Sequence, residues 1–216
     1  MTDSAVDFFV KEGLYAAVVG DVLDQMGYVN QFLPADVRAL NDRMVVGRAM
    51  PVQLADSNRI RGTGFAKLTE ALDQLRAGEV YVASGGRVPC AAWGELMTAA
   101  ARNRGAVGAV VNSYHRDTER ILAQDWPVFS RGSYAQDAAV RSVVVAYRVR
   151  IDIEGVDVSP GDLVVGDRDG VLIVPQGIET EVLERAREKM QAEDRVRAAI
   201  ETGVSATEAF NTYGAF

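Results

Sequence analysis

Residues 84–117 read SGGRVPCAAWGELMTAAARNRGAVGAVVNSYHRD and decide the fold of this chain. An apolar run at Val80–Ala83 precedes the glycine pair and is typical of a buried strand. An alanine-rich helix is predicted at Ala91–Arg104, and a second buried strand at Ala106–Val111. Strand, helix and strand within so few residues predict a right-handed βαβ unit. The stretch therefore indicates a mixed α/β protein with a βαβ core.

The stretch ends in the adjacent pair Arg116-Asp117, just after the second predicted strand. The carboxyl end of a strand is where open α/β sheets bind ligands. Arginine presents a fork that matches a carboxylate, and aspartate offers hard oxygen ligands to Mg²⁺ or Mn²⁺. The pair is a candidate site for binding a small anion and a metal ion. An ordinary surface ion pair is the alternative on spacing alone.

Further candidate groups lie at the start of the predicted helix. Gly94-Glu95-Leu96-Met97 would place free backbone N–H groups where they can bind a carboxylate. Glu95 could be a metal partner, a base, or a favourable charge at a helix N-terminus. The glycine pair Gly85-Gly86 would let backbone approach a ligand closely. His115, the single histidine, is a candidate general base, although strand alternation can turn it away from the site.

The flanking segments extend the α/β pattern on both sides, within a single domain spanning residues 1–216. Before the central stretch, apolar periodicity predicts helices within residues 1–27, and Met44–Leu54 is predicted to form a strand that bends or ends at Pro51. Downstream, we expect strands and one long amphipathic helix that begins at Ile178, with an aromatic tail that docks on its own domain or on a neighbouring subunit. The predicted elements are helices at 5–13, 15–26, 65–76, 117–123 and 178–202, strands at 126–130, 142–150 and 152–158, and a hairpin of 163–165 with 171–174.

Composition excludes several classes of function. The 216 residues carry a net charge of −7, and no Lys/Arg run provides the basic footprint that nucleic acid requires. We find no signal peptide, and no apolar run approaches the roughly 20 residues that span a bilayer. Cys90 is the single cysteine, which fits a reducing compartment. We therefore expect a cytoplasmic protein that binds neither nucleic acid nor membrane.

Several motifs together resemble the RraA-like proteins, a family that includes class II pyruvate aldolases. The closest agreement is Gly94-Glu95-Leu96-Met97 followed about twenty residues later by Arg116-Asp117. Supporting segments are Asp21-Val22-Leu23-Asp24, Gly47-Arg48-Ala49, Pro127–Gly132, Pro160-Gly161-Asp162 and Gly166–Val171. The resemblance covers nearly the whole chain. It implies a swivelling β/β/α domain with N-terminal helices and a long C-terminal helix, assembled as homotrimers or homohexamers with the site between subunits.

The resemblance also implies an activity and a role for each motif. Asp117 would bind Mg²⁺, Mn²⁺ or another divalent cation, and Arg116 would bind a 2-oxo acid whose carboxylate meets the amides of residues 94–97. Glu193, on the C-terminal helix of a neighbouring subunit, would face the metal. The activity expected is a lyase that releases pyruvate from 2-oxo dicarboxylic acids, either by retro-aldol cleavage of 4-hydroxy-4-methyl-2-oxoglutarate or by decarboxylation of oxaloacetate. Catalytic roles fall to Arg116, Asp117, Glu95 and His115.

The alternative within the same family is a non-catalytic regulator that binds and inhibits an RNA-degrading endonuclease. Regulators of that kind tend to lack the metal-binding aspartate, so the presence of Asp117 favours the enzyme. This chain departs from the family pattern at Ser84, at Asn112-Ser113 and at His115. These departures affect the expected identity of the substrate more than they affect metal binding.

Overall fold

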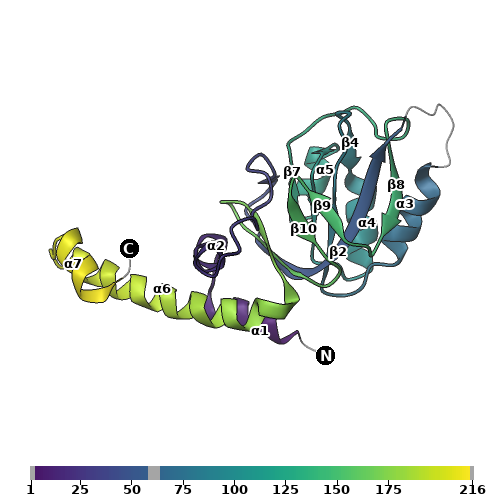
Figure 1. The fold of residues 1–216 in the computed structure, drawn as a ribbon. Coiled ribbons are helices and arrows are strands. Elements are labelled where there is room, and N and C mark those ends of the chain that lie inside the picture. The colour runs from purple at the N-terminus through teal and green to yellow at the C-terminus, as the bar shows by residue number, and fades with distance from the viewer. Residues whose placement is uncertain (1–2, 58–63, 215–216) are drawn as a thin grey trace.

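The computed structural model describes residues 3–57 and 64–214 and has the mixed α/β architecture that the sequence predicts. Its largest sheet has the strand order β1-β7-β5-β3-β2-β11-β12, and β8 also pairs with β2 (Figure 1). Two small two-stranded sheets, β4–β6 and β9–β10, complete the β structure of the described residues. The strands are β1 Arg38–Ala39, β2 Val45–Asp56, β3 Glu79–Ala83, β4 Ala91–Trp93, β5 Gly108–Val111, β6 Tyr114–His115, β7 Val128–Ser130, β8 Ser142–Tyr147, β9 Ile151–Ile153, β10 Val156–Val158, β11 Leu163–Gly166 and β12 Val171–Val174.

The helices are distributed unevenly around this sheet (Figure 1). Helices α3, α4 and α5 lie beside the sheet, whereas α1 and α2 pack against the first part of the long helix α6. The helices are α1 Ser4–Glu12, α2 Ala16–Gln25, α3 Gly64–Asp73, α4 Glu95–Asn103, α5 Thr118–Leu122, α6 Glu179–Glu201 and α7 Ala206–Tyr213, with a 3₁₀ turn at Gln176–Ile178. The predicted N-terminal helices and long C-terminal helix are thus confirmed. None of the helices in the described ranges is long and apolar enough to cross a membrane.

The central strand β2 is not ended by Pro51, because it continues through this residue to Asp56. On one edge, residues Arg48 to Val52 pair in parallel with β3. On the other edge, β11 pairs as far as Arg48 and β8 takes over from Val52. Pro51 therefore stands where one antiparallel neighbour replaces the other, a position at which its missing N–H leaves no gap in a ladder.

The predicted βαβ unit is present as β3, α4 and β5, with β3 and β5 parallel and fully buried. One part of the prediction is wrong, because Ala91 to Trp93 form strand β4 instead of the first turn of the helix. Parallel pairing with β6 overrides the helical propensity of the two alanines. The helix begins only at Glu95, after the extended residue Gly94.

The N-terminal helices, α6 and one face of the hairpin β11–β12 share a hydrophobic cluster, whereas Val164 and Ile173 on the other face of the hairpin belong to a second cluster. The predicted hairpin caps α2, since Asp167 Oδ2 accepts a hydrogen bond from the N–H of Ala16 at 2.8 Å. Arg48 connects β2 to both ends of the chain: its Nη2 donates to Asp3 Oδ1 at 2.7 Å and to Glu179 Oε1 at 3.1 Å. The guanidinium of Arg48 lowers the pKa of the Asp3 carboxyl.

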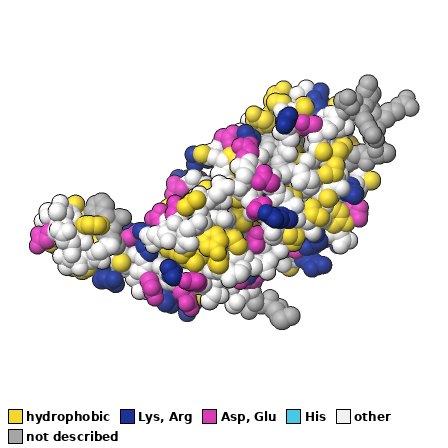
Figure 2. All heavy atoms as spheres, viewed as in Figure 1, with side chains coloured by type: hydrophobic (Ala, Val, Ile, Leu, Met, Phe, Trp, Pro, Cys, Tyr) yellow, Lys and Arg dark blue, Asp and Glu magenta, His cyan; other side chains and the backbone are white. Residues whose placement is uncertain are grey.

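The second half of α6 and the helix α7 extend away from the sheet (Figure 1). Helix α7 packs on α6 through Ala209, which is fully buried, so part of the tail docks on its own chain as predicted. Phe210 and Tyr213 stay 51% and 41% exposed, and Phe216 lies outside the described residues. Figure 2 shows acidic and basic side chains intermixed over the visible face, with no continuous basic patch on that face.

Candidate functional site

The site begins with the turn between β4 and α4, which the parallel pairing of β4 with β6 brings beside the Arg-Asp pair. The N–H of Arg116 donates to the carbonyl of Trp93 at 3.0 Å. Trp93 is buried and donates from Nε1 to Thr98 Oγ1 at 2.9 Å, and that hydroxyl donates to the carbonyl of Gly94 at 3.1 Å. These bonds fix Gly94 and the start of α4 against Arg116.

Asp117 is held in an unusual backbone conformation that turns its carboxylate toward α4. Its φ of 61° lies in the left-handed region, which aspartate and asparagine tolerate better than most residues. Asp117 Oδ2 accepts a hydrogen bond from the N–H of Glu95 at 3.3 Å and lies 3.9 Å from Arg116 Nε. A Cβ on Gly94 would lie 2.9 Å from the same oxygen, so a larger residue here would require the carboxylate to shift.

A pocket of about 320 Å³ opens beside these groups. Arg116 and Asp117 line it, and the side chain of each is 41% exposed. A second carboxylate reaches the pocket from a distant loop, where Asp137 Oδ1 lies 3.6 Å from Arg116 Nη1. The remaining lining residues are Phe65, Leu68, Thr69, Leu72, Ala91, Ala92, Trp93, Gly94, Leu96, Met97, Ala100 and Ala138. The pocket thus has a charged mouth and an apolar wall.

The first turn of α4 supplies further groups at this mouth. No side chain of its own segment caps the helix, and the N–H of Glu95 is taken by Asp117. The N–H groups of Leu96 and Met97 have no partner within the helix and belong to residues that line the pocket. Together with the Arg116 guanidinium, they form a set of donors suited to a carboxylate or an enolate oxygen.

The structure brings together most of the predicted substrate-binding residues, but not all of them. Gly94, Leu96, Met97 and Arg116 line the pocket, whereas Glu95 contributes its amide to Asp117 and its side chain does not line the pocket. Glu95 as a catalytic acid or base therefore has no support from the geometry.

His115 points to the opposite side of β6, away from this pocket. Its Nδ1 lies 2.7 Å from Ser130 Oγ, and its Nε2 lies 3.1 Å from Thr118 Oγ1. The side chain is almost fully buried, and burial lowers its pKa. Both ring nitrogens are already bonded, so the predicted role of His115 as the base is not supported.

The residues expected to bind the metal are Asp117 in the pocket and Glu193 on α6. In the described residues, no three His, Cys, Asp or Glu side chains cluster in a way that could hold a metal ion. Asp117 and Asp137 are the two carboxylates in the pocket. Glu193 lies on α6, where Oε2 accepts a hydrogen bond from the Tyr15 hydroxyl at 3.1 Å and Oε1 pairs with Lys189 Nζ at 2.7 Å.

The glycine pair after β3 lies outside the pocket, and Gly85 permits a close backbone contact within the fold. Neither Gly85 nor Gly86 lines the pocket, and a Cβ on Gly85 would lie 1.8 Å from the carbonyl oxygen of Asn112. Ser84 is buried, and its hydroxyl accepts a hydrogen bond from the N–H of Leu54 at 3.0 Å. Sequence reasoning missed Asp137 and Phe65, and no local motif marks either residue, because long-range folding brings them to the pocket.

The fold and the site define a mixed α/β protein with a pocket lined by Arg116 and Asp117. The family model described as "RraA-like: Aldolase/RraA" matches residues 16–173, and the chain belongs to this family. A relative from Halalkalibacterium halodurans, named "Putative 4-hydroxy-4-methyl-2-oxoglutarate aldolase", is 32% identical over 97% of this chain and 96% of its own length. Protein DlpA from Legionella pneumophila is 28% identical over 92% of this chain, which spans about a third (32%) of that longer protein.

Solved structures support the same fold. The crystal structure of an uncharacterised protein from Pseudomonas syringae superposes with a TM-score of 0.87 at 32% identity, covering 99% of this chain and 95% of that one. Streptomyces coelicolor RraAS2, described as an unusual member of the RNase ES inhibitor RraA family, superposes with a TM-score of 0.78. The superposition covers 91% of this chain and 97% of that chain, but at 24% identity it supports the fold alone.

Proposed function

We propose that this chain is a divalent-metal-dependent lyase that cleaves a C–C bond in 2-oxo acids and releases pyruvate. The observation that carries the proposal is the grouping of Arg116, Asp117 and the free amides of Leu96 and Met97 around one pocket. The aldolase names of relatives such as the one from H. halodurans support a lyase at the level of the family.

The residues at the mouth of the pocket are proposed to have different roles in a retro-aldol cleavage. Arg116 and the α4 amides bind the carboxylate and 2-oxo group, where charge develops as the C3–C4 bond breaks and its electron pair forms the pyruvate enolate. Asp137 is the pocket carboxylate proposed to accept the proton of the 4-hydroxyl group. This cleavage releases C4 as a second carbonyl product, and protonation of the enolate at C3 then gives pyruvate. Decarboxylation of oxaloacetate needs the enolate stabilisation but no base.

Asp117 is the residue proposed to hold the metal ion. An exposed carboxylate fits Mg²⁺, which proteins often bind through one or two carboxylates with water and substrate oxygens filling the other positions. When bound, such a cation supplies Lewis-acid polarisation of the 2-oxo group. The expected contribution of Glu193 from a neighbouring subunit stays part of this proposal, as does assembly into trimers or hexamers. Light scattering tests the assembly, and a monomer would remove the role of Glu193.

The test is pyruvate release from oxaloacetate and from 4-hydroxy-4-methyl-2-oxoglutarate, with Mg²⁺ and with EDTA. Oxaloacetate decarboxylates spontaneously in the presence of metal, so the Arg116→Ala protein sets the background. Arg120→Ala, which removes an exposed arginine from the neighbouring helix α5, is the matched control. We expect metal-dependent turnover by the wild type and by Arg120→Ala that exceeds the Arg116→Ala background. Absence of such turnover would instead favour a non-catalytic regulator of the RraA type.

A further inference from the structure

The apolar wall of the pocket carries information about the part of the substrate that lies beyond its 2-oxo acid group. Among the described residues that line the pocket, the only charged side chains are Arg116, Asp117 and Asp137, all at the mouth. The wall is built from α3 and α4 and includes Phe65, Leu68, Leu72, Met97 and Ala100. None of these described wall residues carries a charge that could pair with a second carboxylate.

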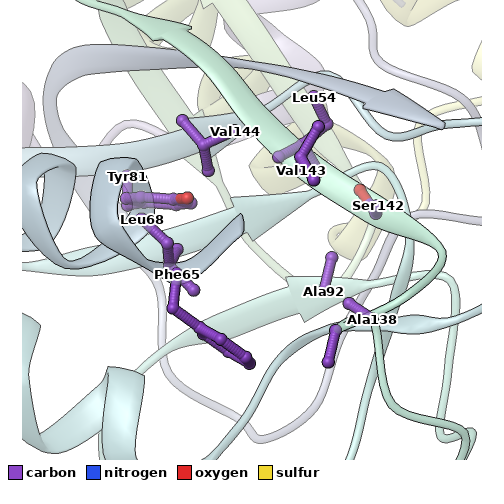
Figure 3. Close-up of a pocket in the computed structure, with 10 residues that line it drawn as sticks. Leu54, Phe65, Leu68, Tyr81, Ala92, Ala138, Ser142, Val143 and Val144 are labelled. Carbon is purple, nitrogen blue, oxygen red and sulfur yellow. The ribbon is translucent and has the colours of Figure 1, made fainter. Parts of the chain in front are cut away.

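The wall continues into a smaller recess of about 40 Å³ that shares Phe65, Leu68, Ala92 and Ala138 with the main pocket. Figure 3 shows this recess, where the hydroxyl oxygens of Tyr81 and Ser142 stand among carbon side chains. The volume suits one or two non-hydrogen atoms, given roughly 30 Å³ of liquid volume per water molecule.

The two hydroxyls of the recess cannot replace a cation. Ser142 Oγ is buried without a hydrogen-bond partner, and Tyr81 is almost fully buried. Burial raises the pKa of Tyr81, so its hydroxyl stays neutral. The recess can therefore bond an uncharged polar atom or accommodate an apolar group, but it cannot neutralise a carboxylate.

The charges at the mouth also disfavour a second carboxylate. The Arg116 guanidinium already lies between two carboxylates, 3.9 Å from Asp117 Oδ2 and 3.6 Å from Asp137 Oδ1. The carboxylate of a 2-oxo acid would become its third anionic neighbour. A fourth, at the far end of the substrate, would face an apolar wall whose described residues offer it no charged partner, and partial desolvation without a partner disfavours a charge.

We propose that the apolar wall binds the uncharged, apolar tail of a 2-oxo monocarboxylic acid. This inference rests on the proposed function, because Arg116 and the α4 amides define which end of the molecule holds the carboxylate. The preferred substrates of the lyase are then 4-hydroxy-2-oxo acids with an aliphatic or aromatic group at C4. A dicarboxylate such as 4-hydroxy-4-methyl-2-oxoglutarate, which the sequence led us to expect, is a poorer substrate.

The first experiment measures binding and does not depend on turnover. Isothermal titration with Mg²⁺ compares 5-methyl-2-oxohexanoate with 2-oxoglutarate, which have the same chain length and end in an isopropyl group and a carboxylate of nearly the same shape. Neither compound carries the 4-hydroxyl group that cleavage requires. We expect the isopropyl compound to bind at least about tenfold more tightly, a usual degree of discrimination by an apolar pocket. Equal or tighter binding of 2-oxoglutarate would overturn the inference, as would failure of both compounds to bind.

Two variants locate the effect in the wall. Thr69→Arg adds a cation at an exposed position on α3, where the Thr69 hydroxyl bonds only within its own helix. We expect this variant to shift the binding ratio toward 2-oxoglutarate by about tenfold, as expected for a charge-assisted contact. Phe65→Ala should reduce the preference for the isopropyl tail, whereas Phe210→Ala should not. The two phenylalanines are equally exposed, at 50% and 51%, so Phe210 is a matched control.

A second experiment separates this inference from the proposed function. It compares pyruvate release from 4-hydroxy-5-methyl-2-oxohexanoate and from 4-hydroxy-2-oxoglutarate. Retro-aldol cleavage of the first gives pyruvate and 2-methylpropanal, and cleavage of the second gives pyruvate and glyoxylate. A higher kcat/KM for the isopropyl substrate supports both conclusions. A higher value for the dicarboxylate overturns the inference and leaves the lyase intact, whereas tail-selective binding without any cleavage retains the apolar pocket and overturns the lyase.

Discussion

The two sides of strand β6 place polar groups in opposite situations. On the pocket side, Arg116 and Asp117 are each 41% exposed, and no hydrogen bond joins their side chains. On the other side, His115 is buried, with one ring nitrogen 2.7 Å from Ser130 Oγ and the other 3.1 Å from Thr118 Oγ1. Thus His115 has both ring nitrogens bonded within the fold, whereas its neighbours Arg116 and Asp117 remain partly exposed.

This difference indicates which polar side chains remain available to bind a ligand. A buried side chain whose donors and acceptors are all satisfied stabilises the fold, and a ligand would have to displace those bonds. A side chain held in place by backbone contacts but left partly open can bind a ligand without that cost. Changes on the pocket side should therefore alter activity, and changes on the buried side should alter stability.

The strongest test of this comparison is Asp117→Asn. Asparagine keeps the size of the side chain and tolerates a φ of 61°, so the fold should survive while the charge is lost. We expect the lyase rate to fall by about 100-fold or more, the usual cost of removing a key electrostatic group. The control is Asp125→Asn, because Asp125 is also an exposed aspartate with positive φ, at 48°, but lies outside the pocket. Equal loss in both variants would contradict the assignment.

Asp137→Asn should slow retro-aldol cleavage more than it slows oxaloacetate decarboxylation. Cleavage of 4-hydroxy-2-oxo acids requires a base, so its kcat should fall by about 100-fold. Oxaloacetate decarboxylation requires none and should be reduced much less. Parallel assays of pyruvate release measure the ratio. If both reactions fall by the same factor, Asp137 positions Arg116 and does not accept the proton.

Gly94→Ala tests the close approach of α4 to Asp117. The added Cβ would lie 2.9 Å from Asp117 Oδ2 and must displace that carboxylate. We expect about a tenfold loss of kcat/KM, since small displacements of catalytic groups are costly. Gly177→Ala is the matched control, because its Cβ would meet nothing within 4 Å. Unchanged kinetics in Gly94→Ala would show that Asp117 has room to move.

The smallest effect concerns the buried side of β6. Burial lowers the pKa of His115 from its ordinary value of 6.5, so protonation favours the unfolded chain. The free energy of unfolding should therefore decrease as the pH falls below about 6.5, and it should be regained as the pH rises. Urea unfolding of the wild type and of His115→Gln at several pH values measures this. The variant should show a weaker pH dependence and retain lyase activity.

Long, periodic elements were predictable from the sequence, and contacts between distant segments were not. The stripe of Val182, Ala186 and Val196 marked α6, and the two buried runs marked β3 and β5. Strand β4 was missed because two alanines in three residues indicate a helix, and only pairing with β6 makes them extended.

The local motifs of the candidate site were also predictable from the sequence, but its contacts between distant segments were not. Arg116, Asp117 and the turn at Gly94 lie in recognisable motifs, and they do lie together. The direction in which His115 points depends on a two-residue strand that no periodicity reveals. Asp137 and Phe65 come from segments far along the chain, so no spacing rule could associate them with Arg116.

The bonds that Arg48 makes to Asp3 and Glu179 bear on the order in which the chain folds. They connect the start of the chain, its central strand and its last long helix, so they form only after large loops have closed. We expect these bonds to be absent from the transition state for folding, with a φ-value near zero for Arg48→Met. The loss should then appear almost entirely as faster unfolding, so removal of this guanidinium should shorten the lifetime of the folded molecule.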